Sequence, residues 1–558
     1  MNSRRSQIAF RFLPSLADFA FLTPIFFLFG RMEGAQSLLA DCDTGWHIRT
    51  GEWILAHHQV PARDFFSFTK AGDTWFAWEW LSDVGFAWLN HYGGLATVVL
   101  ASLLLLAVTF TLLYRLALRK ANPIVAFLVT LAAAVTSSIH WLARPHLLSL
   151  LFLVLFYGAL ERLRAGQSRF WGVPYMVLLP AATILWTNLH GGFFIGIIMI
   201  GAYGAAEALQ VVLAGDRSQL GPHRTAARRY FLMAAACLAG SFVNPYFYHL
   251  HQHVLEYLGD PYQAQHIAEF LSLSFHHPVA IFFEFLLLAG GGAAIWNLSK
   301  GSYTEPLLFL LWAHAALLAS RNLPLYAIVA TPMVAAALDA WIKTLPALEV
   351  AGWVKGVTQK FLAIAAETAE TERLPRWHLI SAAAILLVAA LLYAPAPPRH
   401  FRPEYDPASY PAGAIAVLRQ DPSARIFTHD EWGDYLIYRL YPKTRVFVDG
   451  RSDFYGDQFE QKYLDVMNVK YDWENTLGRF GIDTILLPPT APLAGALKES
   501  SRWRVVYDDG IALVFRPSAK NPGDAISSTL SGGGKGRDRE VTKTEARDPL
   551  IAESKSKT

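Results

Sequence analysis

Two acidic residues, Asp41 and Asp43, stand two positions apart in the stretch LLADCDTGWHIRTGEWI (38–54). Side chains at positions i and i+2 of an extended segment point the same way, so we expect both carboxylates to face one site. Such a pair could bind a hard divalent cation, or one carboxylate could act as a base while the other orients it. Alternatively, Asp43 or Thr44 caps a helix that begins near Trp46, because Asp and Thr accept backbone N–H groups there. A cap accounts for one acid of the pair and leaves the other available for chemistry.

The chain that positions these residues has two parts of different composition. Of its 558 residues, 53% are hydrophobic and 17% are charged, whereas soluble proteins carry roughly 25% charged residues. Residues 1–395 contain 47 of the charged residues and residues 396–558 contain 46. The composition excludes a wholly disordered chain, a collagen-like repeat and a disulfide scaffold, and the net charge of +3 gives no reason to expect a nucleic-acid partner. We predict a membrane-embedded first part that contacts membrane lipids and a water-soluble second part.

The first part contains eleven apolar segments that could cross about 30 Å of hydrocarbon. The fifth, seventh and ninth are short. The sequence therefore predicts an α-helical polytopic membrane protein with about eleven membrane-spanning helices, near 12–30, 95–115, 123–141, 146–163, 171–187, 193–213, 230–245, 278–297, 306–320, 324–342 and 377–394.

The cationic residues indicate an orientation in the membrane. If the N-terminus lies in the cytoplasm and the segments alternate, 19 of the 25 Lys and Arg residues of 1–395 lie inside, as the positive-inside rule requires. We therefore expect a multi-pass protein of the inner (plasma) membrane whose C-terminal domain is periplasmic or otherwise extracytoplasmic. The first apolar segment could be a cleavable signal peptide, but we expect a retained helix because the acidic loop after it needs a nearby anchor. The six cationic residues left outside are Arg31, Arg49, Arg63, Lys70, Arg144 and Arg321.

Two large outer loops, 31–94 and 246–277, contain amphipathic patterns, and the run WFAWEWLSDVGFAWLNHY (75–92) is rich in aromatic residues. We interpret both loops as short helices along the membrane surface, where aromatic side chains are favoured. The inside segment 343–376 is expected to form another surface helix.

The soluble second part is predicted to be a small α/β domain over 396–517, because strand-like runs alternate with helical stretches. The tail 518–558 is rich in Gly, Ser, Lys and Glu and is expected to be disordered. Asp449, Arg451 and Asp453 are interpreted as part of a turn after a strand, with carbohydrate binding as the alternative. The expected strands are 424–429, 445–450, 483–488, 503–509 and 511–517.

The membrane part resembles multi-pass glycosyltransferases of the GT-C superfamily, in particular their mannosyltransferase-like bacterial relatives. That superfamily carries an acidic pair in the first outer loop, followed by a surface helix. The resemblance covers residues 12–395, and where relatives often have a His before Glu79, this chain has Trp78. It rests on the stretches ADCDTGWHIRTGEWIL (40–55), VPARDFFSFTKAGDTWFAWEWLSD (60–83), RPHLLSLLF (144–152), WTNLHGGFFIG (186–196) and SRNLPLYAIVATP (320–332).

The resemblance implies a glycosyltransferase that uses a polyprenyl-phosphate-linked sugar and inverts the anomeric carbon. The acceptor would be a glycan, lipid or protein outside the cytoplasm. Asp41 would be the catalytic base, and Asp43 would be the second catalytic acid, supporting the acceptor or a metal ion. Together the two would bind the divalent cation, Mg or Mn, on which some relatives depend.

The leaving polyprenyl phosphate requires positive charge and hydrogen-bond donors. Arg144 and Arg321 lie at outer helix ends, and the guanidinium fork suits phosphate oxygens. The alternative is that both arginines only extend to the membrane interface. Donor phosphate or sugar would also be contacted by His146, His190 and Asn322.

Two further residues, His47 and Glu79, are candidates for binding the acceptor or supporting the site. A transporter or lipid flippase is an alternative function, but it would place charges in the middle of helices along a pathway. The charges in this chain gather at outer helix ends. A non-catalytic assembly protein of the cell envelope is the other alternative.

Overall fold

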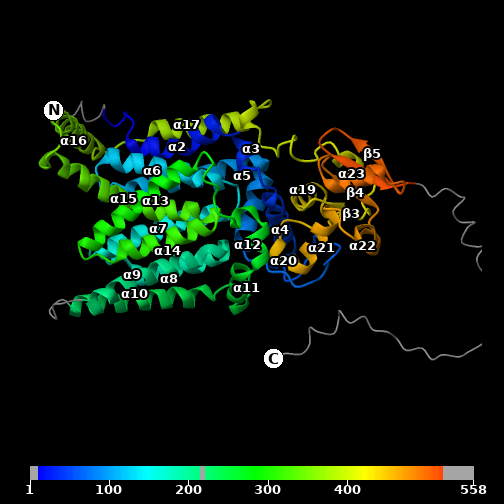
Figure 1. Cartoon of the computed structure of the whole chain (residues 1–558), viewed down its shortest axis with the longest axis horizontal. Helices are drawn as coiled ribbons and strands as arrows, with labels where there is room; N and C mark the ends of the chain where they lie inside the picture. The colour runs from blue at the N-terminus through cyan, green and yellow to red at the C-terminus, as the bar shows by residue number, and fades with distance from the viewer. Residues whose placement is uncertain (1–9, 214–219, 519–558) are drawn as a thin grey trace, which may run out of the picture.

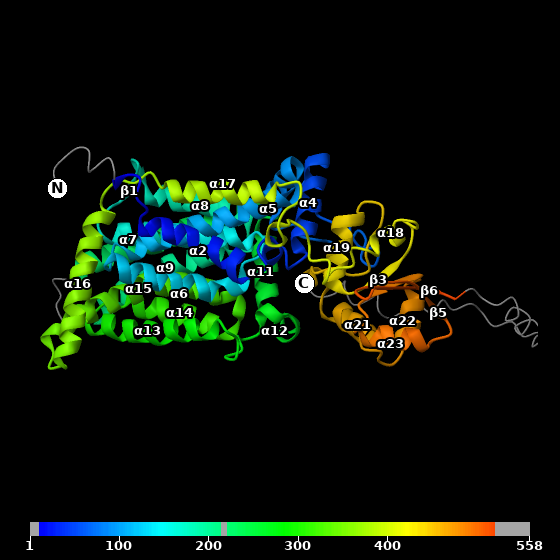
Figure 2. The same cartoon turned by 90° about the horizontal axis from the view of Figure 1, so that it is seen from above.

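The computed structural model describes residues 10–213 and 220–518, and the chain is mostly helical (Figure 1). The long apolar helices of the first part lie side by side with nearly parallel axes, and the sheet-containing domain lies at one end of this bundle (Figures 1 and 2). Helix α16 (Gly352–Glu372) lies at the opposite end of the bundle. Apart from Ser518, the tail that was predicted to be disordered lies outside the described residues.

The first part is built of helices and one short hairpin, β1 (Arg169–Phe170) with β2 (Val173–Pro174). Its other α-helices are α2 (Leu16–Arg31), α3 (Ala35–Leu38), α4 (Asp43–His57), α5 (Trp80–Ala117), α6 (Pro123–Ser137), α7 (His146–Arg164), α8 (Tyr175–Leu189), α9 (Phe194–Leu213), α10 (Leu220–Ser241), α11 (Tyr248–Gly259), α12 (Pro261–His266), α13 (Ala280–Ser299), α14 (Thr304–Leu318), α15 (Leu323–Thr344) and α17 (Leu379–Leu392).

Each of the eleven predicted apolar segments falls on a helix, but the count of about eleven spanning helices is not confirmed. Within the described residues, six helices are long and apolar enough to cross a membrane, and three shorter apolar helices accompany them. Helix α2 has 16 residues, fewer than a full span needs. Helix α10 has 22 residues, but its first half carries Arg224, Arg228 and Arg229.

The predicted surface helix after Trp75 and the following span form one helix, α5, with a break inside it. Gly93 and Gly94 leave helical geometry, and Gly94 has φ +63°, a conformation that glycine adopts without a side-chain clash. The residues from Trp80 to the break therefore form a separate helical segment, whose axis can differ from that of the membrane-spanning segment after the break.

Helix α4 carries Asp43 at its first position and packs against α5 and against α19 (Asp430–Leu440) of the C-terminal domain. Gly51 permits this packing, because a Cβ there would overlap the backbone carbonyl of Asp83 in α5. On the other face, Gly45 lies against Tyr438, and Arg49 Nε donates to the Tyr438 carbonyl at 3.0 Å. Small residues thus let α4 connect the membrane part to the soluble domain.

The C-terminal domain contains a four-stranded sheet in the order β3-β4-β6-β5. Strand β3 (Ile426–Thr428) is parallel to β4 (Thr484–Leu487), and the pairs β4–β6 and β6–β5 are antiparallel. Strands β5 (Trp503–Asp508) and β6 (Leu513–Pro517) match the last two predicted strands. The domain's helices, besides α19, are α18 (Ile415–Leu418), α20 (Ser452–Tyr455), α21 (Asp457–Met467), α22 (Trp473–Arg479) and α23 (Pro492–Glu499).

The predicted strand at 445–450 was wrong, because this segment pairs for a single residue with the outer loop. Val446 N donates to Phe66 O at 3.0 Å, and Phe68 N donates to Val446 O at 3.0 Å. Val446 also forms a one-residue bridge with Ile426 of β3. The segment therefore joins the first outer loop to the domain instead of extending the sheet.

A continuous apolar core connects the two parts of the chain. One cluster of buried side chains runs from the membrane helices to Tyr405, Tyr410, Trp432 and Tyr435 of the soluble domain. A second cluster fills the domain interior around Phe427, and its other members include Phe447, Ile485, Leu513 and Phe515. The soluble domain is thus packed onto the end of the bundle where the acidic loop lies.

Candidate active site

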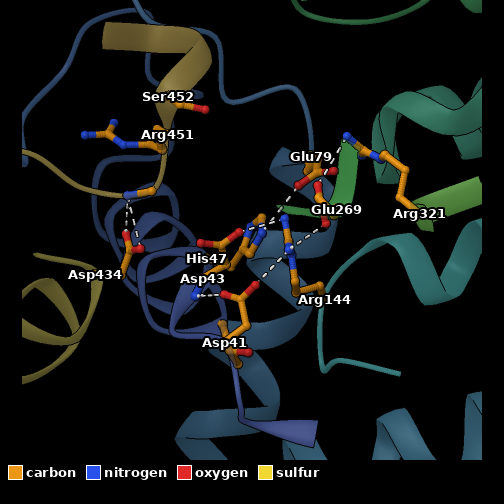
Figure 3. Close-up of polar contacts among 12 residues, drawn as sticks. Asp41, Asp43, His47, Glu79, Arg144, Glu269, Arg321, Asp434, Arg451 and Ser452 are labelled. Atoms are coloured by element: carbon orange, nitrogen blue, oxygen red, sulfur yellow. Dashed lines mark hydrogen bonds and ion pairs between the residues drawn. The ribbon is translucent and has the colours of Figure 1, made fainter. Parts of the chain in front are cut away.

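Asp41 and Asp43 converge on one guanidinium, that of Arg144, which lies between the end of α6 and the start of α7 (Figure 3). Arg144 Nη1 is 2.8 Å from Asp41 Oδ2, and Nη2 is 2.7 Å from Asp43 Oδ2. These are distances of charge-assisted hydrogen bonds. The structure therefore brings together the predicted acid pair and one of the two predicted phosphate-binding arginines.

The two acids do not lie in an extended segment, which corrects the geometry expected from their spacing. Cys42 has helical angles (φ −79°, ψ −3°), and α4 begins at Asp43. Asp41 Oδ1 accepts the backbone N–H of Asp43 at 2.7 Å, and Thr44 Oγ1 donates to Ala143 O instead of capping the helix. Asp41 thus both satisfies the first turn of α4 and contacts Arg144, because its two oxygens face different partners.

A third acid, Glu269, joins the cluster from the second outer loop and is not among the residues predicted from the sequence. Glu269 Oε2 lies 3.6 Å from Arg144 Nη1, and Glu269 Oε1 lies 3.2 Å from Arg321 Nη1. Arg321 also donates to Tyr257 OH at 3.0 Å, and its guanidinium lies over the Phe270 ring. Glu269 therefore links the two arginines. The only sequence signal for Glu269 was an acid in an outer loop.

A chain of hydrogen-bonding groups runs beside this cluster, through His47, Glu79 and His190. His47 Nδ1 lies 2.6 Å from Asp83 Oδ1, and His47 Nε2 lies 3.4 Å from Glu79 Oε2. The other oxygen of Glu79 is 3.2 Å from His190 Nε2. His190 Nδ1 accepts the backbone N–H of Gly192 at 2.9 Å, so the proton of the neutral ring is on Nε2 and points at Glu79.

Burial determines the protonation states of His47, Glu79 and His190. Burial lowers the pKa of His47 well below its ordinary value. Burial and the positive charges of the nearby Arg321 and Arg144 together lower the pKa of His190 to about 3. Burial raises the pKa of Glu79 to about 8, although Arg144 opposes the rise. At neutral pH we therefore expect two neutral imidazoles on either side of a protonated carboxyl group.

The acids that contact Arg144 and Arg321 differ in how readily they ionise. Burial raises the pKa of Asp43 well above its ordinary value, against the attraction of Arg144. Burial also opposes ionisation of Glu269, but Arg321 and Arg144 outweigh it and lower the pKa of Glu269 to about 2. Glu269 is thus firmly ionised, whereas Asp43 holds a proton more readily.

His146 and Asn322, which were predicted to contact the donor, are engaged with backbone carbonyls. His146 Nε2 lies 2.9 Å from His140 O, and its buried Nδ1 has no partner among the described residues. Asn322 Nδ2 donates to Ala315 O at 3.0 Å. Both lie at the end of the bundle that carries the acidic cluster, and their contact with a donor stays a prediction.

The soluble domain brings a fourth acid close to the pair. Asp434 of α19 accepts the backbone N–H of Gly450 at 3.1 Å with both oxygens. A Cβ at Gly450 would lie 2.6 Å from Asp434 Oδ2 and 2.8 Å from Asp43 Oδ1, so both carboxylates lie against this glycine and close to each other. Burial raises the pKa of Asp434, and the nearby Asp43 adds to the rise. Sequence reasoning missed Asp434 because its proximity depends on docking of the domain.

The turn after Gly450 is held by a buried ion network. Arg451 Nε and Nη2 each lie 2.7 Å from an oxygen of Asp449, and Nη2 is 2.8 Å from Asp64 Oδ1 in the first outer loop. All three side chains are at most 1% exposed. The residues interpreted as a turn therefore fasten the soluble domain to the loop that carries Asp41.

A divalent cation does not fit the acids as they are arranged. Mg²⁺ and Mn²⁺ sites are built from oxygen ligands, and Asp41 and Asp43 were the expected donors. Both instead direct an oxygen to the Arg144 guanidinium, and Asp41 directs its other oxygen to a backbone N–H. Among residues 10–213 and 220–518, no group of three His, Cys, Asp or Glu side chains is placed to hold a metal ion.

The comparisons with known proteins place the fold. No protein-family model matches the chain, and no curated protein matches it. A structure of the archaeal oligosaccharyltransferase AglB from Archaeoglobus fulgidus, in complex with an inhibitory peptide and a dolichol-phosphate, is similar with a TM-score of 0.53 and 12% sequence identity. That similarity covers 91% of this chain and 74% of AglB. Another Archaeoglobus fulgidus oligosaccharyltransferase structure, in complex with Zn and sulfate, has a TM-score of 0.48 and 13% identity over 85% of this chain and 68% of that one.

The similarity to AglB covers the membrane bundle and the soluble domain together, since it spans nine-tenths of the chain. At 12% identity it concerns the arrangement of the backbone. The chain therefore shares the fold of AglB, and its two large loops and C-terminal domain meet at one end of a helical bundle.

Proposed function

We propose that this protein is a membrane glycosyltransferase that transfers a sugar from a polyprenyl-phosphate donor to an extracytoplasmic acceptor, with inversion at the anomeric carbon. The observation that carries the proposal is the convergence of Asp41, Asp43 and Glu269 on Arg144 and Arg321, at the end of the bundle where the soluble domain docks. The GT-C fold supports it, and so does the dolichol-phosphate, a polyprenyl phosphate, in the AglB complex.

Asp41 is the proposed base. Its side chain is 29% exposed and that of Asp43 is 13% exposed, so an acceptor hydroxyl reaches Asp41 more readily. Asp41 takes the proton of the acceptor hydroxyl while that oxygen attacks the anomeric carbon and the bond to the donor phosphate breaks. Asp43 supports Asp41 by holding the other arm of the Arg144 guanidinium in place.

Arg321 is the proposed partner of the departing phosphate. Only its Nη1 donates to protein groups within the described residues, namely to Glu269 and Tyr257. Nε and Nη2 are left to bind phosphate oxygens in the forked geometry of a guanidinium. Arg144 adds positive charge nearby, but both of its Nη atoms are engaged by Asp41 and Asp43.

The acceptor would enter between the outer loops and the soluble domain. Asp434 and the turn at Gly450 lie next to Asp43 there, which supports a role for the domain in forming the acceptor side of the site. Glu79 and His47 are buried next to the acidic cluster, so we expect them to hold the residues of the acceptor side in position.

The proposal is tested in cells that lack this protein, by mass spectrometry of lipid-linked sugars and cell-surface glycans. Wild-type protein should restore a missing glycan and lower the level of its lipid-linked donor. Asp41→Asn should lose about 10²-fold or more of this activity, as expected when a general base is removed. Asp73→Asn is the matched control, because Asp73 is an exposed acid of the same outer loop.

Restoration of the glycan by Asp41→Asn at wild-type membrane levels would exclude Asp41 as the base. Identical glycans and lipid-linked sugars with and without the wild-type protein would contradict the proposed activity itself, and would favour a non-catalytic protein.

A further inference from the structure

Three carboxylates from two distant outer loops surround a single guanidinium. Asp41 and Asp43 come from the first loop, Glu269 comes from the second, and each has an oxygen 2.7–3.6 Å from an Nη atom of Arg144 (Figure 3). Arg144 itself follows α6 and is thus supplied by a third part of the chain. Acids that meet in this way repel one another unless a cation lies between them.

That cation is permanent here. A guanidinium does not lose its proton in proteins, and its planar fork addresses two carboxylates at once. Asp41 and Asp43 use both arms of the fork, so a metal ion could bind the pair only by displacing Arg144. Displacement would leave the arginine, whose side chain is only 21% exposed, without its partners.

We infer that Arg144 takes the place of a divalent cation at this site, so that a guanidinium organises Asp41, Asp43 and Glu269 and the protein binds no metal ion there. The inference deepens the proposed function, and its consequence for sugar transfer, independence from divalent cations, rests on that proposal. The binding of metal ions can be tested whether or not transfer occurs.

The experiment measures Mn²⁺ binding to the purified full-length protein by electron paramagnetic resonance of free Mn²⁺. The wild-type protein should show no binding that depends on Asp43. Arg144→Ala removes this guanidinium and leaves Asp41 and Asp43 unpaired, while Glu269 keeps Arg321 as a partner. The variant should bind Mn²⁺ about tenfold or more tightly than wild type, because unpaired carboxylates in a poorly hydrated site favour a cation.

Two further proteins make the result specific. Arg144→Ala combined with Asp43→Asn should lose the gained Mn²⁺ binding. Arg115→Ala, at an exposed arginine in the last turn of α5, should bind Mn²⁺ no better than wild type. A melting curve for each protein establishes that it is folded.

Tight Mn²⁺ binding by the wild-type protein that disappears in Asp43→Asn would overturn the inference. So would a folded Arg144→Ala protein that binds no Mn²⁺, because the inference requires the carboxylates freed by the substitution to accept a metal ion in place of the guanidinium. Absence of glycosyl transfer in every protein would contradict the proposed function and leave the metal-binding result as it stands.

A second inference comes from two adjoining cavities at the other end of the bundle. Helix α7 begins beside Arg144 and has 19 residues, which at 1.5 Å per residue is about the thickness of the hydrocarbon layer. The cavities therefore lie at the opposite membrane boundary. Each has a volume of about 470 Å³, one lies between the ends of α5 and α7, the other lies between α15 and α16, and Arg119 and Lys120 line both.

The acids of these cavities are engaged by other groups, which leaves an excess of positive charge. Glu161 is paired with Lys120, and Asp339 accepts hydrogen bonds from Asn122 and Lys343. Glu372, which also lines the second cavity, accepts hydrogen bonds from the backbone N–H of Leu16 and from Tyr114 OH. Neither Arg119 nor Arg162, which lines the first cavity, forms an ion pair within the described residues. Basic cavities between helices at this boundary suit the phosphate groups of lipids.

We propose that the paired cavities bind a phosphate group, that of an anionic lipid headgroup. The test is native mass spectrometry and thermal melting of the full-length protein with phosphatidylglycerol, with phosphatidylcholine, or with inorganic phosphate alone. Wild-type protein should retain and be stabilised by phosphatidylglycerol. Arg119→Gln combined with Arg162→Gln should weaken this binding by about 25-fold, from about 1 kcal/mol for each cation near the surface.

Arg228→Gln is the control, because Arg228 is exposed on α10 and lines neither cavity. Stabilisation by inorganic phosphate without a preference for phosphatidylglycerol would overturn the lipid as the source of the phosphate. Equal binding of both lipids, or equal loss in the control, would overturn the site.

Discussion

The buried ion network at Arg451 leads to a quantitative prediction about docking of the soluble domain. Arg451 lies between Asp449 and Asp64, all at most 1% exposed, with nitrogen–oxygen distances of 2.7–2.8 Å. Arg451→Met keeps much of the side-chain volume but leaves two buried carboxylates without a counter-charge. Breaking a buried pair in this way costs about 3–5 kcal/mol, because the remaining charge is uncompensated.

The assay is the unfolding of the C-terminal domain in detergent, followed by tryptophan fluorescence, together with limited proteolysis of residues 396–518. Arg451→Met should lower the free energy of unfolding by that amount and expose the domain to protease. Adding Asp64→Asn should recover part of the loss, because one of the two unpaired charges is removed. The two effects are therefore expected to be strongly non-additive.

Arg445→Met is the matched control, since Arg445 is exposed in the same segment. A neutral effect of Arg451→Met would refute the reasoning. Additive effects of Arg451→Met and Asp64→Asn would also refute it, because the network would then not couple the outer loop to the domain.

Three further predictions concern the site and its supports. With a pKa of about 8 in the folded protein and an ordinary value near 4.5, Glu79 ionises first in the unfolded chain. Stability should therefore fall as pH rises from 4.5 to 8, and melting temperatures at pH 7 and 8.5 should differ less in Glu79→Gln than in wild type. Gly51→Ala should lower stability by about 1–3 kcal/mol through overlap with the Asp83 carbonyl, whereas Gly85→Ala, at an open position, should not, as melting curves would reveal. Arg321→Gln should reduce kcat for transfer about 10²-fold in the glycan assay, and an unchanged rate would exclude it as the phosphate partner.

Local patterns were sufficient to predict much of the protein. Apolar segments placed a helix at each of eleven positions, because a chain in hydrocarbon must satisfy its backbone hydrogen bonds within helices. The acid pair Asp41 and Asp43, and the arginines Arg144 and Arg321, stood out because charge is scarce in the membrane part. The structure brings all four into one cluster, and their catalytic roles stay predictions.

The rest required the folded chain. Glu269 and Asp434 belong to segments more than 200 residues from Asp41 in the sequence, and no local spacing indicates that they meet it. Docking of the soluble domain brings Asp434 next to Asp43 and diverts Val446 from the sheet to the outer loop. The spacing of two acids was equally compatible with a metal ion or a base. The arrival of the Arg144 guanidinium between them depends on helix packing, and this packing determines which cation the carboxylates face.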